Sequence, residues 1–270
     1  MTVAVTGSTG HVGGLVARSL AEDLRTDLRL VVRDASRAPA YDTDVRVCTY
    51  AEHDASVAAL EGADLLFMVS AAEAADRREQ HRTFVRAAAD AGVRHVVYTS
   101  FAGAAPDATF TLGRDHADAE AAIRESGMAF TFLRDNFYLD LLPHFADAEG
   151  VIRGPAGDGR VAAVARADVA EAAVAVLRDP GAHAGATYTL TGPEALTMSE
   201  IAERAGVRFE DETEDAAYAW RREQYGAEQW QLDAWVSTYR AIRDGSVAEV
   251  TGDVERLTGH PPRSLADLLG

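Results

Sequence analysis

The apolar positions in the first half of the chain form short continuous runs that alternate with longer stretches of helical period. The runs are rich in β-branched residues, which is typical of strands buried on both faces of a parallel sheet. They predict strands at Thr2–Thr6, Leu28–Val32, Val45–Thr49, Leu65–Ser70, Val93–Thr99 and Phe130–Leu133. The intervening stretches predict helices at Val12–Leu24, Ala55–Leu60, Gln80–Ala91 and Asp115–Glu125, with Gly92 and Gly127 as C-terminal caps.

This alternation implies right-handed βαβ crossovers, so the predicted fold is α/β, a Rossmann-type doubly wound parallel sheet. After Arg134 the pattern changes to a loop and an aromatic-bearing helix (135–149), a turn-rich segment (154–159), a helix (167–177), a strand (186–190) and mostly helix from Thr197. We expect residues 1–134 to form a nucleotide-binding domain, to which residues 155–192 return. Residues 135–270 are expected to form a smaller, mostly helical lobe that covers the substrate.

Composition narrows the class of protein. The formal net charge of −17 disfavours nucleic-acid binding, which depends on neutralising phosphates. No run of eighteen apolar residues occurs, so we expect no membrane span and no signal peptide. The single cysteine, Cys48, fits a reducing cytoplasm. All 26 basic residues are arginines, so lysine chemistry is excluded throughout the chain.

The first strand is followed by a glycine pattern that predicts a dinucleotide site. Gly7 suits the tight strand-to-helix turn, Gly10 allows the backbone to approach a pyrophosphate, and Gly13 permits close packing of helix on sheet. The pyrophosphate would lie on the free N–H groups of the first helix. The segment expected to bind it comprises Gly7, Ser8, Thr9, Gly10, His11, Val12 and Gly13.

The end of the second strand indicates which dinucleotide is bound. An acidic residue there binds the ribose of NAD, whereas an arginine accommodates the 2′-phosphate of NADP. Arg33 occupies this position and favours NADP(H) over NAD(H), although Asp34 next to it offers a carboxylate for ribose. Arg37 is either a second phosphate ligand or a solvated loop charge.

The chain resembles the atypical, NmrA-like short-chain dehydrogenase/reductases, and especially the NADPH-dependent quinone oxidoreductases of that group. The similar segments span nearly the whole chain and include Thr6–Gly13, Val32–Asp34, Gln80–Arg82, Tyr98–Ser100, Leu133–Tyr138, Ala156–Arg160, Arg166–Asp168, Leu190–Pro193 and Leu257–Pro262. The resemblance implies that Arg33 and the glycine loop hold the adenosine phosphates. It further implies that the nicotinamide half lies against Ser70, Ala71, Ala72, Asn136, Phe137, Tyr138 and Arg166.

The chain departs from this superfamily at the usual proton-donor pair. Aligned on Glu120, the tyrosine and lysine of the Tyr-x-x-x-Lys pattern are replaced by Leu112 and His116. The candidate catalytic residues are therefore His116, because histidine titrates near working pH, together with Tyr138 and Ser100. His116 and Tyr138 also have a purely structural interpretation, and the role of Ser100 rests on its superfamily position alone. No His or Cys spacing predicts a metal site.

These observations predict an NADPH-dependent oxidoreductase that transfers hydride to a quinone or a similar conjugated, electron-poor small molecule. Such a reaction does not need a strong general acid, because the reduced quinone oxyanion is stabilised. Two alternatives remain, namely a non-enzymatic NADP(H)-binding redox sensor of NmrA type and a biosynthetic tailoring reductase or isomerase. The resemblance to this family implies that the chain forms a homodimer. Four aromatic residues either cover an aromatic substrate or belong to a core, namely Trp220, Tyr225, Trp230 and Trp235.

Overall fold

The computed structural model describes residues 1–23 and 26–270. The chain divides into two compact units, the first made of residues 1–100, 115–134 and 169–188. The second contains residues 101–114, 135–168 and 189–270. This division differs from the expected boundaries in two ways. Residues 101–114 belong to the second unit, and of the expected range 155–192 only residues 169–188 belong to the first. The physical reason for the first difference is that Phe101 and Phe110 pack on Phe137 in the core of the second unit.

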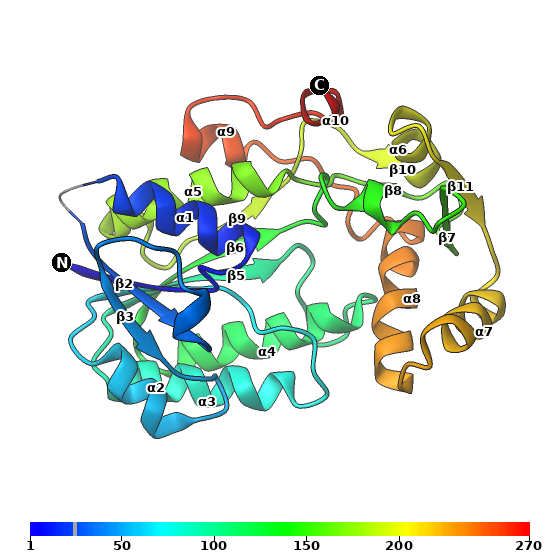
Figure 1. Ribbon diagram of the computed structural model, residues 1–270. Coiled ribbons are helices and arrows are strands. Elements are labelled where there is room, and N and C mark those ends of the chain that lie inside the picture. The colour runs from blue at the N-terminus through cyan, green and yellow to red at the C-terminus, as the bar shows by residue number, and fades with distance from the viewer. Residues whose placement is uncertain (24–25) are drawn as a thin grey trace. The chain divides into compact units, whose positions relative to one another are not determined.

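A seven-stranded sheet in the order β3-β2-β1-β4-β5-β6-β9 organises the first unit (Figure 1). Strands β1, β2, β3, β4 and β5 pair in parallel, with Val3 opposite both Leu28 and Leu65. The chain moves outward from β1 in both directions, and the order reverses between β1 and β4. The bounds are β1 Thr2–Thr6, β2 Asp27–Val32, β3 Asp44–Val47, β4 Leu65–Met68, β5 His95–Phe101, β6 Ala129–Asp135 and β9 Thr187–Leu190.

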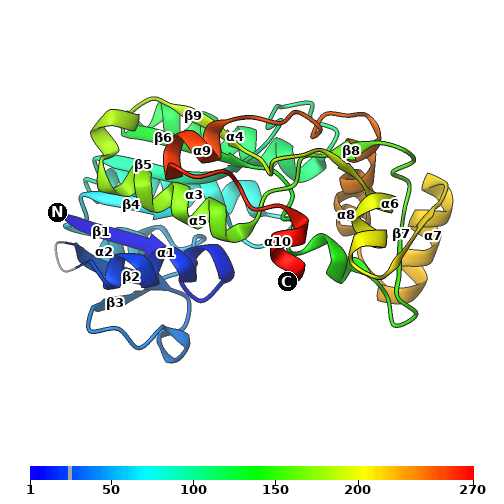
Figure 2. The same cartoon turned by 90° about the horizontal axis from the view of Figure 1, so that it is seen from above.

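Helices cover both faces of this sheet, with α1 and α5 on one face and α2, α3 and α4 on the other (Figures 1 and 2). Their bounds are α1 His11–Ala21, α2 His53–Leu60, α3 Arg77–Asp90, α4 Thr111–Glu125 and α5 Arg166–Arg178. Helix α3 begins three residues earlier than predicted, and Leu24 of the predicted first helix lies outside the described residues. Gly92 and Gly127 have φ values of 82° and 78°, which confirms them as glycine caps. The predicted Rossmann-type α/β fold is confirmed.

The second unit contains short strands that the sequence did not predict. Strand β7 (Val151–Gly154) pairs in parallel with β11 (Arg208–Asp211), and β8 (Arg160–Val161) pairs antiparallel with β10 (Leu196–Thr197). The helix expected within residues 135–149 is only the 3₁₀ turn η2, Leu142–Phe145. The other elements are 3₁₀ turns η1 Ala35–Arg37 and η3 Pro180–His183, and helices α6 Met198–Arg204, α7 Glu214–Tyr225, α8 Gln229–Arg243, α9 Asp253–Thr258 and α10 Leu265–Leu269.

Candidate functional site

The loop between β1 and α1 requires glycine at two of its three predicted positions. Gly7 has a φ of 66°, and a Cβ there would lie 2.8 Å from the Cβ of Val69. A Cβ on Gly13 would lie 2.4 Å from the Gly7 carbonyl oxygen, so only glycine allows α1 to approach the loop this closely. Gly10 has an ordinary φ of −101° and more room, since the nearest atom to its Cβ would be 3.4 Å away.

This loop also fits a phosphate ligand. Ser8 is 2% exposed, yet its Oγ has no hydrogen-bond partner within residues 1–23 and 26–270. A buried hydroxyl without a partner is costly, and a bound phosphate oxygen would satisfy it. The loop leads into an eleven-residue helix whose N-cap, Gly10, offers no side-chain cap, so N–H groups of the first turn are available to an anion. His11 is exposed and Val12 is buried.

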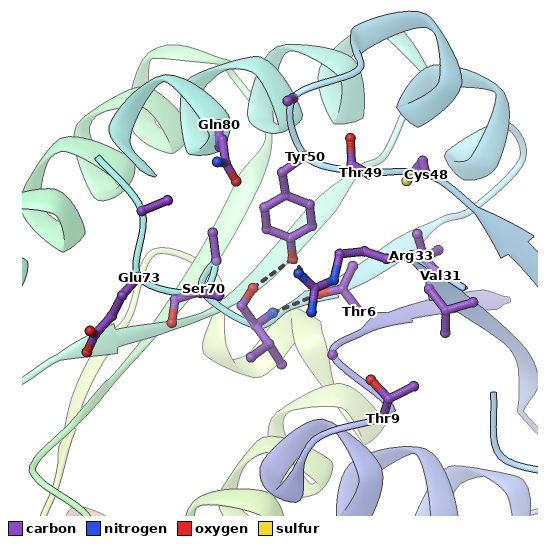
Figure 3. A pocket seen from close by; sticks show the side chains of 17 residues that line it. Thr6, Thr9, Val31, Arg33, Cys48, Thr49, Tyr50, Ser70, Glu73 and Gln80 are labelled. Atoms are coloured by element: carbon purple, nitrogen blue, oxygen red, sulfur yellow. Dashed lines mark hydrogen bonds between the residues drawn. The ribbon is translucent and has the colours of Figure 1, made fainter. Parts of the chain in front are cut away.

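A pocket of about 400 Å³ lies at the carboxyl edge of the sheet within the first unit (Figure 3). It brings together six of the predicted cofactor-binding residues, Gly7, Thr9, Arg33, Ser70, Ala71 and Ala72. Its walls come from the ends of β1, β2, β3 and β4, and Gln80 of α3 completes it. The reversal of strand order between β1 and β4 is the place where doubly wound sheets bind ligands.

Arg33 lines this pocket, and its guanidinium makes no ion pair or hydrogen bond with the described part of the chain. The neighbouring Asp34 carboxylate is already engaged, because it accepts hydrogen bonds from the Ser36 hydroxyl (2.7 Å) and backbone N–H (2.9 Å). These bonds lower the pKa of Asp34 and cap η1. Arg37 is exposed on η1 and does not line the pocket. The arrangement leaves a cation, rather than a carboxylate, open to a ligand.

The sequence did not single out Tyr50, which forms one wall of the pocket (Figure 3). Its hydroxyl lies 2.7 Å from both the Thr6 hydroxyl and the Val69 carbonyl oxygen, so it ties β1 to the residue after β4. Its ring stacks on Phe84 at 3.9 Å between centroids. Burial raises the pKa of Tyr50, which stays a neutral hydrogen-bond donor. Its position just after a strand that ends at the same sheet edge was the available signal.

Ser100 and His116 belong to the first unit but do not line the pocket. Ser100 is 3% exposed and donates to Glu120 at 2.6 Å, and Arg134 holds the same carboxylate. His116 is 6% exposed, with Nδ1 3.0 Å from the Tyr98 hydroxyl and Nε2 3.1 Å from Arg77. Both side chains are thus integrated into buried polar networks, and their catalytic roles remain predictions.

The expectation that His116 titrates near working pH is wrong. Burial, and then the neighbouring Arg77 charge, hold the pKa of His116 well below 6.5. Because a guanidinium only donates, Nε2 of His116 must accept, and the ring proton sits on Nδ1 facing Tyr98. His116 is therefore a neutral ring fixed between two partners.

Acidification should destabilise the protein partly through His116. Since its folded-state pKa lies below the unfolded value of about 6.5, only the unfolded chain takes up this proton as the pH falls below 6.5. The stability contribution is complete above that pH and is lost at up to about 1.4 kcal/mol per pH unit below it. His116→Gln keeps an acceptor toward Arg77 and cannot titrate. In urea unfolding, the wild type should lose about 2 kcal/mol more than this variant between pH 7 and 5. Equal losses would show that His116 is not held neutral.

The remaining predicted residues belong to the second unit. Asn136 is 2% exposed, donates to the Val247 carbonyl (2.9 Å) and accepts from the Phe137 N–H (2.8 Å). The Phe137 ring packs in the core of this unit. Arg166 pairs with Asp140 at 2.6 Å. Asn136, Phe137 and Arg166 are thus held by other residues of the second unit. That any of the three contacts a cofactor remains a prediction.

Tyr138 leads to a group that the sequence did not predict. Its hydroxyl lies 3.2 Å from Oδ2 of Asp135, the last residue of β6. Asp135 is 3% exposed, and its Oδ1 has no hydrogen-bond partner among the described residues. Burial raises the pKa of Asp135 well above its usual range, and burial beside Asp135 likewise raises that of Tyr138. Asp135 and Tyr138 thus form a buried, hydrogen-bonded pair.

No helix in the described chain is long and apolar enough to span a membrane.

Comparisons with known proteins agree with this geometry. A family model described as NAD(P)H-binding matches residues 7–180. The chain is 31% identical to quinone oxidoreductase 2 of Escherichia coli strain K12 and 32% identical to the NAD(P)H azoreductase of Xenophilus azovorans, covering 98% of this chain and 96% of each relative. The crystal structure of the E. coli NADPH-dependent quinone oxidoreductase with NADPH has a TM-score of 0.89 and 29% identity, covering 100% of this chain and 98% of that one.

A third relative shows that the likeness extends to another reductase. The (4-alkanoyl-5-oxo-2,5-dihydrofuran-3-yl)methyl phosphate reductase of Streptomyces griseus is 34% identical over 98% of this chain and 95% of its own length. The resemblance inferred from the motifs is confirmed by these matches. With its glycine loop, its pocket at the reversal of strand order and a family match over residues 7–180, the chain belongs to the NAD(P)H-binding family of oxidoreductases.

Proposed function

We propose that this protein is an NADPH-dependent oxidoreductase that transfers hydride to a quinone or a similarly conjugated, electron-poor small molecule. The observation that carries the proposal is the pocket lined by Gly7 and Arg33, together with the adjoining glycine loop, in which the Ser8 hydroxyl has no hydrogen-bond partner among the described residues. The three relatives reported above act, by their names, on a quinone, an azo compound and an unsaturated lactone. Each of those groups is an electron-poor conjugated acceptor.

The residues of the first unit fit NADP(H) and have defined tasks. Ser8 and the N-terminal N–H groups of α1 bind the pyrophosphate, and Arg33 pairs with the 2′-phosphate. Ser70, Ala71 and Ala72 form the wall that orients the nicotinamide ribose. When bound, the cofactor supplies the hydride, which is the hard chemistry of the reaction.

Reduction of a quinone requires one proton besides the hydride. Water supplies this proton, so two electrons and two hydrogens reach the acceptor in each turnover. A strong general acid is not needed, because the reduced quinone oxyanion is stabilised.

The decisive experiment is NADPH oxidation, followed by nicotinamide absorbance, against a panel of quinones, azo dyes and unsaturated lactones, with NADPH binding titrated in parallel. We expect binding and acceptor-dependent turnover with at least one class. Binding without turnover on any acceptor would replace the proposal with the redox sensor, whereas absence of binding would overturn the cofactor site itself. We further propose a cytoplasmic homodimer, an assignment that rests on Cys48 and family resemblance alone.

A further inference from the structure

Two buried side chains of α3 hold the loop after β4 by the backbone of a single residue. The Ala71 N–H donates to Nε2 of His81 at 2.8 Å, and the Ala71 carbonyl accepts from Nε of Arg77 at 2.9 Å. His81 is 0% exposed and Arg77 is 4% exposed. Both polar groups of a peptide in the pocket wall are thus satisfied by side chains of a helix that starts six residues later.

A second layer of contacts fixes Arg77 itself. Its terminal nitrogens lie 3.1 Å from Nε2 of His116 and 3.5 Å from the Asp115 carboxylate, both on α4. The opposite side of the His116 ring meets the Tyr98 hydroxyl of β5 at 3.0 Å. A continuous chain of buried polar contacts therefore runs from the central sheet through α4 and α3 to the Ala71 carbonyl.

His81 acts as a neutral acceptor throughout the ordinary pH range. A backbone N–H only donates, so Nε2 accepts and the ring proton sits on Nδ1. Burial, and then the charge of Arg77, lower the pKa of His81 to about 3, although a hydrogen bond with the Asp115 backbone acts in the opposite direction. His81 is therefore a neutral ring whose Nε2 accepts from Ala71.

The bonds to Ala71 lie between two other points at which the loop is held. Residues 69–76 lie between β4 and α3 and form neither helix nor strand. At the start of the loop, the Val69 N–H donates to the Thr6 hydroxyl at 2.9 Å and the Ser70 N–H donates to the Thr99 hydroxyl at 3.0 Å. Near its end, the Ala74 carbonyl accepts from the Arg77 N–H at 3.2 Å. The bonds to Ala71 fix the wall between these points, at the first of the pocket residues Ala71, Ala72, Glu73 and Ala74.

We propose that Arg77 and His81 are positioning residues that hold the Ala71 peptide, and thereby the wall formed by residues 70–74, in the shape that receives the nicotinamide half of NADPH. His116 and Asp115 act one step further away, by holding Arg77. This inference rests on the proposed cofactor site and assigns His116 a role in positioning instead of proton transfer. A preorganised wall increases affinity because the cofactor need not order the loop on binding.

A matched pair of variants tests His81. Gln places its side-chain oxygen where Nε2 lies, whereas Asn reaches only to the position of Nδ1, and both are polar and of similar size. In a fluorescence titration with NADPH, we expect His81→Gln to bind within about threefold of wild type and His81→Asn about tenfold more weakly. Arg82→Gln serves as the control, because Arg82 of the same helix pairs with Asp118 and does not touch the loop.

Arg77 is tested by Arg77→Lys, which keeps the charge beside Asp115 but lacks the fork that reaches Ala71 and His116 together. We expect KM for NADPH to rise about tenfold, with kcat at saturating NADPH within about twofold of wild type. A role limited to folding would instead lower kcat with the amount of active protein and leave KM unchanged. If His81→Gln and His81→Asn bound NADPH equally well, or if Arg77→Lys left KM unchanged, this inference would be overturned. The cofactor site would still be supported as long as the wild type bound NADPH. A wild type that fails to bind NADPH would overturn the proposed function instead.

Discussion

Replacing Arg33 by alanine is expected to raise KM for NADPH roughly thirtyfold and to leave KM for NADH within about threefold of wild type. The guanidinium lines the pocket, and within residues 1–23 and 26–270 it has no hydrogen-bond or ion-pair partner to lose. A charge-assisted bidentate contact with a phosphate contributes about 2 kcal/mol to binding, and the loss of this free energy corresponds to the roughly thirtyfold rise in KM. NADH lacks the 2′-phosphate, so its affinity does not depend on the contact. Steady-state kinetics with both cofactors measures the change in preference.

Arg37→Ala is the matched control, because Arg37 carries the same charge four residues away but does not line the pocket. We expect it to change neither KM by more than about threefold. If the two variants weakened NADPH equally, a diffuse positive field and not a direct contact would explain the preference. If Arg33→Ala weakened NADH as much as NADPH, Arg33 would not recognise the 2′-phosphate.

The sheet could be predicted because its strands are buried on both faces. All residues of β4 and β5 are buried, and apolar residues predominate in both, so the sequence indicated that these strands exist. Their ends were less certain, because the prediction for β4 ran two residues too far and that for β5 was displaced by two residues at each end. The edge strand β3 has no buried residue, and its prediction was displaced by one residue at its start and two at its end. Local composition thus indicates that a strand is present, whereas its exact ends depend on pairing with neighbouring strands.

The second unit was harder because its strands depend on distant partners. Val151 of β7 pairs with Arg208 of β11, 57 residues later, and each strand has only four residues. Residues 208–211 are mostly exposed and polar, with no pattern that distinguishes them from a loop. Only the pairing in space makes this segment a strand, and no local signal reports that pairing.

The same distinction applies to the candidate site. Gly7, Gly13 and Arg33 were predictable, because the turn, the helix packing and the strand end that require them lie within one βαβ unit. The environment of His116 was not predictable, because Arg77, whose guanidinium donates to its Nε2, lies 39 residues away in the sequence. The bond between His81 and Ala71 was not predictable either, because it forms only when α3 packs against the loop after β4.

Substituting Gly13 by alanine should lower the free energy of unfolding by about 3 kcal/mol and weaken NADPH binding at the same time. The added Cβ would lie 2.4 Å from the Gly7 carbonyl oxygen and 2.8 Å from that of Thr6, and neither is the movable end of a side chain. Helix α1 must therefore shift away from the loop, and its first-turn N–H groups move with it. Urea unfolding and NADPH titration of the same sample measure the two effects.

Gly10→Ala separates the two effects, because its Cβ would meet only the Gly7 carbonyl oxygen, at an ordinary 3.4 Å. Its φ of −101° suits any residue, so we expect the free energy of unfolding to change by less than about 1 kcal/mol. The methyl group nonetheless occupies the surface that the pyrophosphate approaches, and NADPH affinity should fall about tenfold or more. Undiminished affinity in Gly10→Ala would mean that the pyrophosphate does not lie against this turn, whereas unchanged stability in Gly13→Ala would mean that α1 can retreat from the loop without cost. The first result would place the phosphate site further along the pocket, toward Arg33. The second would show that the close approach of α1 to the loop does not require glycine at position 13.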